Sequence, residues 1–177
     1  MEIFLQAPGP KSQGTEIAAG IVQHFDDDDR FHSQTAFAEI CSELSQQLAR
    51  HLVGDHGMRP RFTAHVMVEM LLDSEIENRL PGTLDRYYET LSKVDPVCLL
   101  DTINQLALRP STRFSEFLPR YMNEKFMFDY LEDRSLMNRL NGVLRRVRLA
   151  ELPRSVTDVI SWARTKVHER YDELLSD

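Results

Sequence analysis

The chain has 177 residues, of which 42% are hydrophobic and 28% charged, enough for one globular domain with its own core. Its formal net charge of −7 disfavours general attraction to nucleic acid or to an anionic membrane surface. The sequence shows no membrane-spanning apolar run, no secretory signal and no thiolate zinc motif, so we expect a soluble, cytoplasmic protein in which Cys41 and Cys98 are buried free thiols.

Helical periodicity dominates the sequence. Apolar residues recur at three- and four-residue steps, and sustained two-residue alternation is absent. We therefore predict an all-α, single-domain bundle of about seven or eight helices, with residues 1–14 as an irregular lead-in and residues 15–177 as the helical domain. The predicted helices are, in order, 15 to 24 or beyond with Thr15 as a cap, then 33–53, 60–80, 83–94, 96–108, a kinked segment over 114–131, 133–148 and 153–175.

Prolines and short polar residues punctuate this order. Pro60 is a favourable first-turn residue for the third helix, and Asp95 is a predicted cap for the helix that begins at Pro96. Pro119 must start or kink a helix inside the aromatic segment.

The first candidate chemical group is His24, Asp28 and His32, spaced four residues apart. On a continuous helix these side chains are neighbours on one face, although the stripe drifts by about 40° per step. Imidazole and carboxylate groups are good ligands for zinc, manganese or iron. The alternative is that residues 26–29 form a solvated acidic turn in which one Asp caps the next helix.

The second candidate group is His65 and Glu69, one helical turn apart in an otherwise apolar helix. Burying either side chain without a partner would cost several kcal/mol. A shared metal ion or a mutual hydrogen bond satisfies both equally well. Asp73, one turn further on, is expected at the surface.

The third candidate group is an arginine-rich stretch between Arg134 and Arg154, a local reversal of charge in an acidic chain. Guanidinium groups pair with carboxylates and phosphates, which suggests docking of an anionic partner. The alternative is that these arginines complement a helix C-terminus and cover apolar surface. The residues predicted to contact a partner are Arg139, Arg145, Arg146 and Arg148.

Together and in this order, the three groups resemble the motifs of the acyl carrier protein phosphodiesterase family, whose members are all-helical relatives of HD-type metal phosphohydrolases. Gly20, Ile21, His24 and Asp28 match the first motif, and His32 stands where the family has Asp. In the second motif His65 and Glu69 stand at Asp positions and Met70 stands at the family's His. The third motif is matched by Tyr130, by Leu140-Asn141-Gly142 and by Arg146. The family's N-terminal His and Asp are absent from residues 4–14.

The resemblance implies a metal-dependent phosphodiester hydrolase that releases 4′-phosphopantetheine from holo acyl carrier protein. It implies a divalent cation (Mn, Fe or Zn), with His32 as a further ligand or outer base. The implied metal ligands are His24, Asp28, His65 and Glu69. The alternative function is a catalytically inactive helical binding protein on the same fold, which docks an acidic partner such as acyl carrier protein through the arginines. A third possibility is that the polar pairs form core hydrogen bonds only. The sequence leaves the oligomeric state open.

Overall fold

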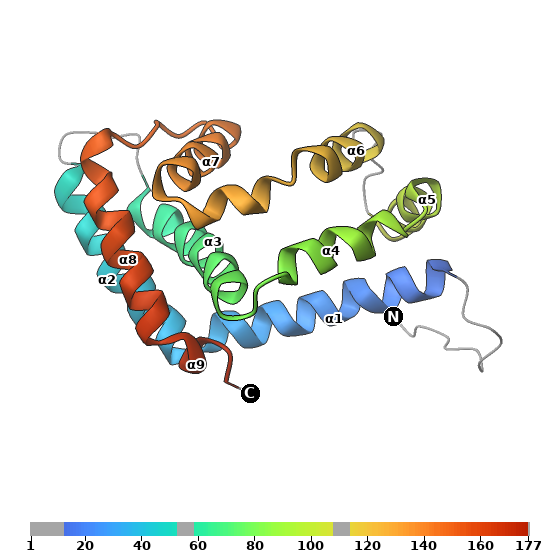
Figure 1. Cartoon of the computed structure of the whole chain (residues 1–177), viewed down its shortest axis with the longest axis horizontal. Helices are drawn as coiled ribbons and strands as arrows, with labels where there is room; N and C mark the ends of the chain where they lie inside the picture. Colours follow the sequence, from blue (N-terminus) through green and yellow to red (C-terminus); the bar gives the residue numbers. More distant parts are fainter. Residues whose placement is uncertain (1–12, 53–58, 108–113, 177) are drawn as a thin grey trace.

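The computed structural model describes residues 13–52, 59–107 and 114–176, and all regular structure in these ranges is helical (Figure 1). The all-α prediction is therefore confirmed. The long helices are α1 (Gln13–Ser33), α2 (Thr35–His51), α3 (Pro60–Arg79), α4 (Thr83–Ser92), α5 (Pro96–Leu106), α6 (Phe114–Glu124), α7 (Asp133–Arg146) and α8 (Thr157–Glu169). Shorter elements are the 3₁₀ segments η1 (Phe126–Leu131) and η2 (Arg154–Val156) and the single turn α9 (Tyr171–Leu174). No helix in the described ranges is long and apolar enough to cross a membrane.

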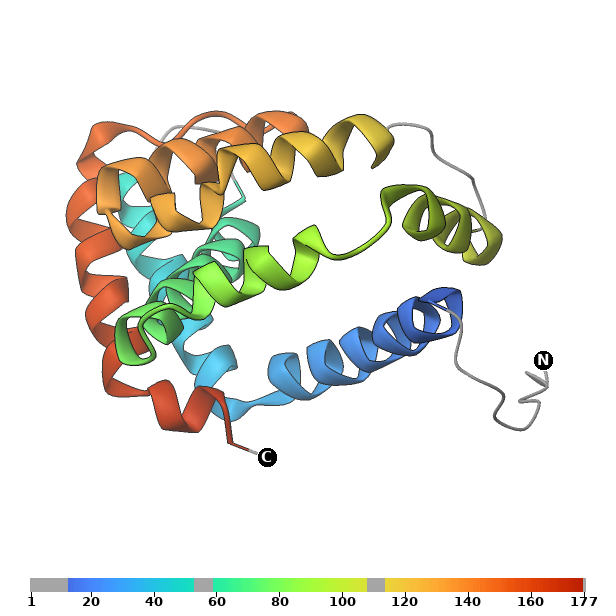
Figure 2. The same ribbon diagram turned by 45° about the vertical axis from the view of Figure 1, so that its right-hand side comes forward.

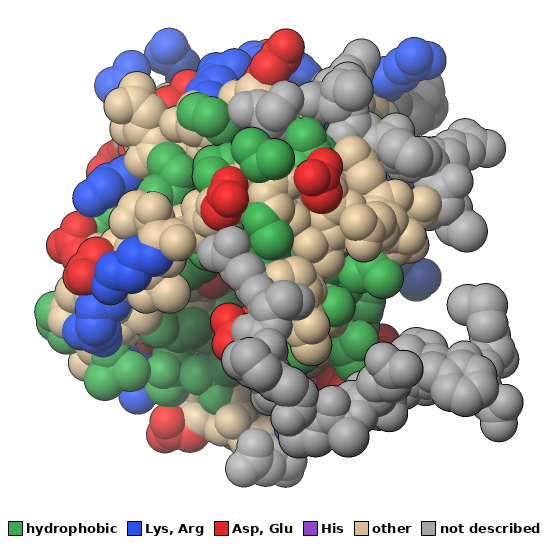
Figure 3. Space-filling view, turned by 90° about the vertical axis from the view of Figure 1, so that its right-hand side faces the viewer, with side chains coloured by type: hydrophobic (Ala, Val, Ile, Leu, Met, Phe, Trp, Pro, Cys, Tyr) green, Lys and Arg blue, Asp and Glu red, His purple; other side chains and the backbone are tan. Residues whose placement is uncertain are grey.

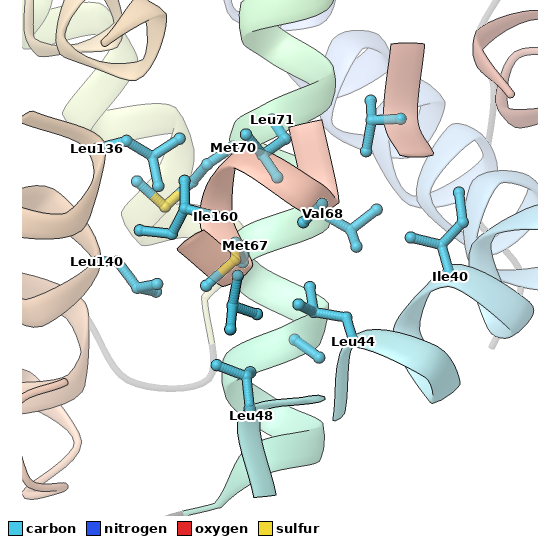
Figure 4. Packing of buried hydrophobic residues seen from close by; sticks show 14 of the residues in the cluster. Ile40, Leu44, Leu48, Met67, Val68, Met70, Leu71, Leu136, Leu140 and Ile160 are labelled. Atoms are coloured by element: carbon cyan, nitrogen blue, oxygen red, sulfur yellow. The ribbon is translucent and has the colours of Figure 1, made fainter. Parts of the chain in front are cut away.

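The hydrophobic core lies where α2, α3, α7 and α8 meet (Figure 4). Leu44 from α2, Met67 from α3, Leu140 from α7 and Ile160 from α8 are each fully buried there. α3 is the central helix, because it packs against α2, α8, α7 and η1. This position explains why its sequence is apolar on more than one face. The backbone of α3 is consequently held from several sides.

A second part of the molecule projects from this core. α1 runs away from α2 and packs along α5, while α4 and α5 lead outward to α6 (Figures 1 and 2). None of the residues of α5 is buried, although its sequence is strongly apolar. The outer helices therefore rest on one another more than on the main core.

The first helix continues beyond His24, and its predicted cap is wrong. α1 is continuous from Gln13 to Ser33, so the acidic residues 26–29 lie within it and not in a turn, and Thr15 is inside the helix and not its cap. The chain breaks instead at Gln34, whose backbone is extended with φ −64° and ψ 131°. Because the break follows His32 directly, the C-terminal end of α1 is turned against α3. Residues 1–12 of the predicted lead-in lie outside the described ranges.

Other boundaries agree closely with the sequence. Asp95 accepts a hydrogen bond from the Val97 amide at 2.9 Å, as predicted for the cap of α5. Pro119 is accommodated inside α6, and the predicted kinked segment becomes α6 followed by η1. The last predicted helix is divided into η2, α8 and α9.

Two buried polar clusters fix α3 against its neighbours. The buried Glu75 carboxylate accepts a hydrogen bond from Arg79 at 2.7 Å and lies 2.8 Å from His168 Nδ1 on α8. Burial opposes ionisation of Glu75, but the hydrogen bonds from Arg79 and His168 outweigh it and hold the pKa of the carboxyl below its ordinary value. Arg164, also on α8, donates to Ser74 Oγ at 2.6 Å. These contacts set the rotation of α3 and so the direction of its other polar side chains.

Candidate metal centre

Three potential metal ligands meet where the end of α1 approaches α3. His32, His65 and Glu69 each offer one ligand atom, and these atoms lie within 4.8 Å of one another. Glu69 Oε1 is 3.0 Å from His32 Nε2 and 3.1 Å from His65 Nε2. Two imidazoles and one carboxylate form a donor set that suits zinc, iron or manganese. The three side chains are partly exposed, so an ion has access to them.

The two imidazoles are held by an aromatic neighbour. The ring of the buried Phe37, on α2, lies 4.9 Å from the His32 ring and 5.1 Å from the His65 ring. The histidine rings themselves are 4.5 Å apart. Packing of this kind restricts both side chains to the arrangement in which their Nε2 atoms face Glu69.

Asp28 supports this group from outside. Its Oδ2 atom lies 3.3 Å from Nδ1 of His32, one turn further along α1. A carboxylate at Nδ1 favours the tautomer with the proton on that nitrogen, which leaves the lone pair of Nε2 free. The Glu69 carboxylate favours the other tautomer, because with the proton on Nε2 the 3.0 Å contact is a hydrogen bond from His32 to Glu69 Oε1. With the proton on Nδ1 instead, the Nε2 lone pair faces Glu69, and a cation between these two acceptors would satisfy both.

His24 is separated from these three residues. It is exposed on α1, two turns before His32, which corresponds to about 12 Å of helix axis. Its ring contacts Phe25, with 5.8 Å between centroids. The structure thus brings together three of the five predicted residues, places Asp28 behind His32, and leaves His24 outside the group. The physical reason is that α1 departs from α3 beyond Asp28 and turns toward α5.

A cavity of about 630 Å³ opens beside the group. Its acidic lining residues are Asp27, Asp28, Glu69 and Asp73, while His24 and Arg30 also reach it. Arg30 forms an ion pair with Asp27 and so offsets one of these charges. The remaining carboxylates attract cations and repel phosphodiesters unless a cation is bound. The cavity therefore fits a cation site with room for a further ligand.

Asp73 is the residue of this cavity that the sequence placed wrongly at the surface. It is half-buried, and burial together with the charge of Glu69 raises its pKa to about 6. The same two causes raise the pKa of the Cys41 thiol to about 12, so Cys41 is a protonated thiol near neutral pH and a poor metal ligand. Asp73 follows Glu69 by four residues, and this spacing indicated in the sequence that both side chains lie on the same face of the helix.

The raised pKa of Asp73 predicts a specific pH dependence. Folding favours the protonated form, so the ionised side chain lowers stability as the pH rises from about 4 through about 6. Asp73→Asn should therefore be more stable than the parent chain above about pH 7, by up to about 2 kcal/mol, and nearly equal to it near pH 4. Urea unfolding in the presence of a chelator measures the free energy of unfolding of the variant and of the parent chain at each pH. A stability difference that is the same at the two pH values would contradict this.

The predicted partner-binding arginines are not equivalent. Arg139 donates to Asp129 at 2.6 Å and to Glu124 at 3.3 Å. Arg145 forms a 2.6 Å ion pair with Glu151. These carboxylates offset part of the predicted positive charge.

The other two arginines lie at the end of α7. Arg146 donates to the Gly142 carbonyl oxygen at 3.2 Å, and the exposed Arg148 follows the helix in a left-handed conformation with φ +61°. The contact of all four arginines with an acidic partner stays a prediction.

Comparison with known proteins adds no relative. No protein-family model, curated protein or solved structure matches the chain. The interpretation of the site therefore rests on its own geometry and on the motif resemblance.

Proposed function

We propose that this chain is a metal-dependent phosphodiester hydrolase that holds a divalent cation through His32, His65 and Glu69. The observation that carries the proposal is the meeting of two imidazole Nε2 atoms at one oxygen of Glu69, at 3.0 and 3.1 Å. An Asp28 carboxylate behind His32 is the kind of outer contact that orients a metal-bound histidine. Manganese, iron and zinc all fit these donors.

A bound divalent cation would supply Lewis-acid stabilisation of a phosphodiester and activation of water. The chain's own groups supply the rest. Asp28 contacts Nδ1 of His32 from outside the group, and Phe37 restricts the direction of both imidazoles. Asp73 lines the cavity beside the group and adds a carboxyl group to its wall.

The motif resemblance favours holo acyl carrier protein as the proposed substrate. Such a partner is acidic, so its approach requires a local positive surface on a chain of net charge −7. Arg146 and Arg148, at the C-terminal end of α7, are exposed and are the best placed of the predicted arginines to provide it. Release of phosphopantetheine breaks one phosphodiester bond, the reaction class that the site fits.

Hydrolysis assays test this proposal. We expect manganese-dependent cleavage of bis(p-nitrophenyl) phosphate and release of phosphopantetheine from holo acyl carrier protein, both abolished by EDTA. His65→Ala and Glu69→Gln should each lower the rate by about 100-fold or more, since each removes a ligand of the cation. His51→Ala, an exposed histidine at the end of α2, is the matched control and should retain full activity.

Two results would overturn the proposal. One is activity that survives EDTA and both ligand substitutions. The other is a metal-loaded chain that cleaves neither substrate, which would favour the inactive binding protein instead. Binding of carrier protein without cleavage would support that alternative directly.

A further inference from the structure

A second cavity, of about 360 Å³, lies between α6, η1 and α7. Four arginines line it (Arg120, Arg139, Arg145 and Arg146), whereas Glu124 is the acidic member of its described lining. In Figure 3 Lys and Arg side chains gather along the upper edge of the molecule, the level at which Figure 1 places α6 and α7. Glu124, Asp129 and Glu151 pair with three of these arginines, so the positive charge that remains in excess is that of about one guanidinium group.

Two of these guanidinium groups converge on Gly142. Arg146 Nε donates to the Gly142 carbonyl oxygen at 3.2 Å, and a Cβ atom added to Gly142 would lie 3.9 Å from Nη2 of Arg145. The Arg145 pair with Glu151 uses Nη1, so it leaves Nη2 on the Gly142 side. Among the described residues no carboxylate pairs with Arg146. Guanidinium groups of this kind pair with phosphate oxygens through charge-assisted hydrogen bonds.

The other two arginines are held by carboxylates, which fix their positions and offset part of their charge. Arg120 donates to Glu124 at 2.6 Å, and Arg139 is held by both Glu124 and Asp129. Side chains fixed in this way lose little further freedom when a ligand binds.

The rest of the wall is aromatic. Phe117, Tyr121, Phe126 and Tyr130 follow one another with ring centroids 5.6, 4.8 and 6.2 Å apart. Arg139 lies 5.2 Å from the centroid of the Phe126 ring. Rigid aromatic faces beside guanidinium groups favour a planar ring, through stacking and cation–π contacts. Phe117 is 44% exposed and therefore reachable from solvent.

We propose that this cavity binds a nucleoside monophosphate, with its phosphate at Arg145 and Arg146 and its base against the aromatic wall. The volume is at the small end of the range of about 300–1,000 Å³ that is typical of ligand pockets, which fits one small ligand. The inference is independent of the metal centre.

Calorimetric titration of the EDTA-treated full chain with AMP, inorganic phosphate and adenosine tests the proposal. AMP should bind saturably at sub-millimolar concentration, phosphate more weakly, and adenosine most weakly. The double variant Arg145→Ala, Arg146→Ala should bind AMP at least about tenfold more weakly, because it removes charge-assisted hydrogen bonds to phosphate. Arg134→Ala, an exposed arginine on the same helix but outside the cavity lining, is the matched control and should bind normally.

Three outcomes would overturn the proposal: absence of AMP binding, AMP binding no tighter than that of phosphate, or equal binding by the double variant and the Arg134→Ala control. Circular dichroism should show the double variant folded, since both of its arginines are exposed. His65→Ala should bind AMP like the parent chain. AMP binding would therefore persist if the metal proposal failed, and metal binding would persist if AMP did not bind.

Discussion

Replacing His65 with alanine is expected to weaken divalent-metal binding more than replacing any histidine that lies outside the candidate group. His65 Nε2 and His32 Nε2 both face Glu69 Oε1, so the loss of either imidazole leaves only two donors. We expect the dissociation constant for Zn²⁺ to rise by more than about 100-fold, above the 10- to 100-fold typical of outer contacts. Competition with a chromogenic chelator measures this constant.

The same titration should give a graded series. Asp28→Asn keeps the size of the side chain but removes the carboxylate behind His32, so we expect a loss of about tenfold. His24→Ala should change the affinity little, because His24 lies outside the group, and His51→Ala should not change it at all. Equal affinity of the His65→Ala and His51→Ala variants would refute the assigned ligands.

Leu44→Ala is expected to cause the largest loss of stability. Leu44 is fully buried on α2 at the contact with α3, and its truncation leaves a cavity among rigid neighbours (Figure 4). We expect the free energy of unfolding to fall by about 3 kcal/mol. Urea denaturation measures the change.

The same leucine-to-alanine change at an exposed position is the control for Leu44→Ala. Leu106→Ala removes the same atoms from a side chain that is 57% exposed at the end of α5, so it should cost less than about 0.5 kcal/mol. If both variants lost the same stability, the main core would not lie where α2 meets α3.

Local patterns in the sequence were sufficient for most of the fold. Helical periodicity predicted the helices, Pro60 the start of α3 and Asp95 the cap of α5, because each depends on residues within a few positions of one another. The acidic residues 26–29 were ambiguous, since Asp is frequent both in turns and on the exposed face of a helix. In the structure these residues are helical, and the helix that contains them packs along α5, a contact between segments far apart in the sequence.

The site was less accessible to sequence reasoning. The spacing of His65 and Glu69 predicted their proximity on one helix, and the structure shows it. The approach of His32 to Glu69 depends on the break at Gln34 and on the rotation of α3. Contacts of Glu75 with His168 and of Ser74 with Arg164 fix that rotation against α8. The burial of Asp73 likewise depends on tertiary packing. No short-range pattern encodes these relations.

The most direct test of the metal centre is anomalous diffraction from crystals grown with Mn²⁺ or Zn²⁺. We expect an anomalous peak about 2.0–2.3 Å from Nε2 of His32, Nε2 of His65 and a carboxylate oxygen of Glu69. A structure at saturating metal with no peak there, and with an imidazolium of His32 bridging Asp28 and Glu69 instead, would contradict it.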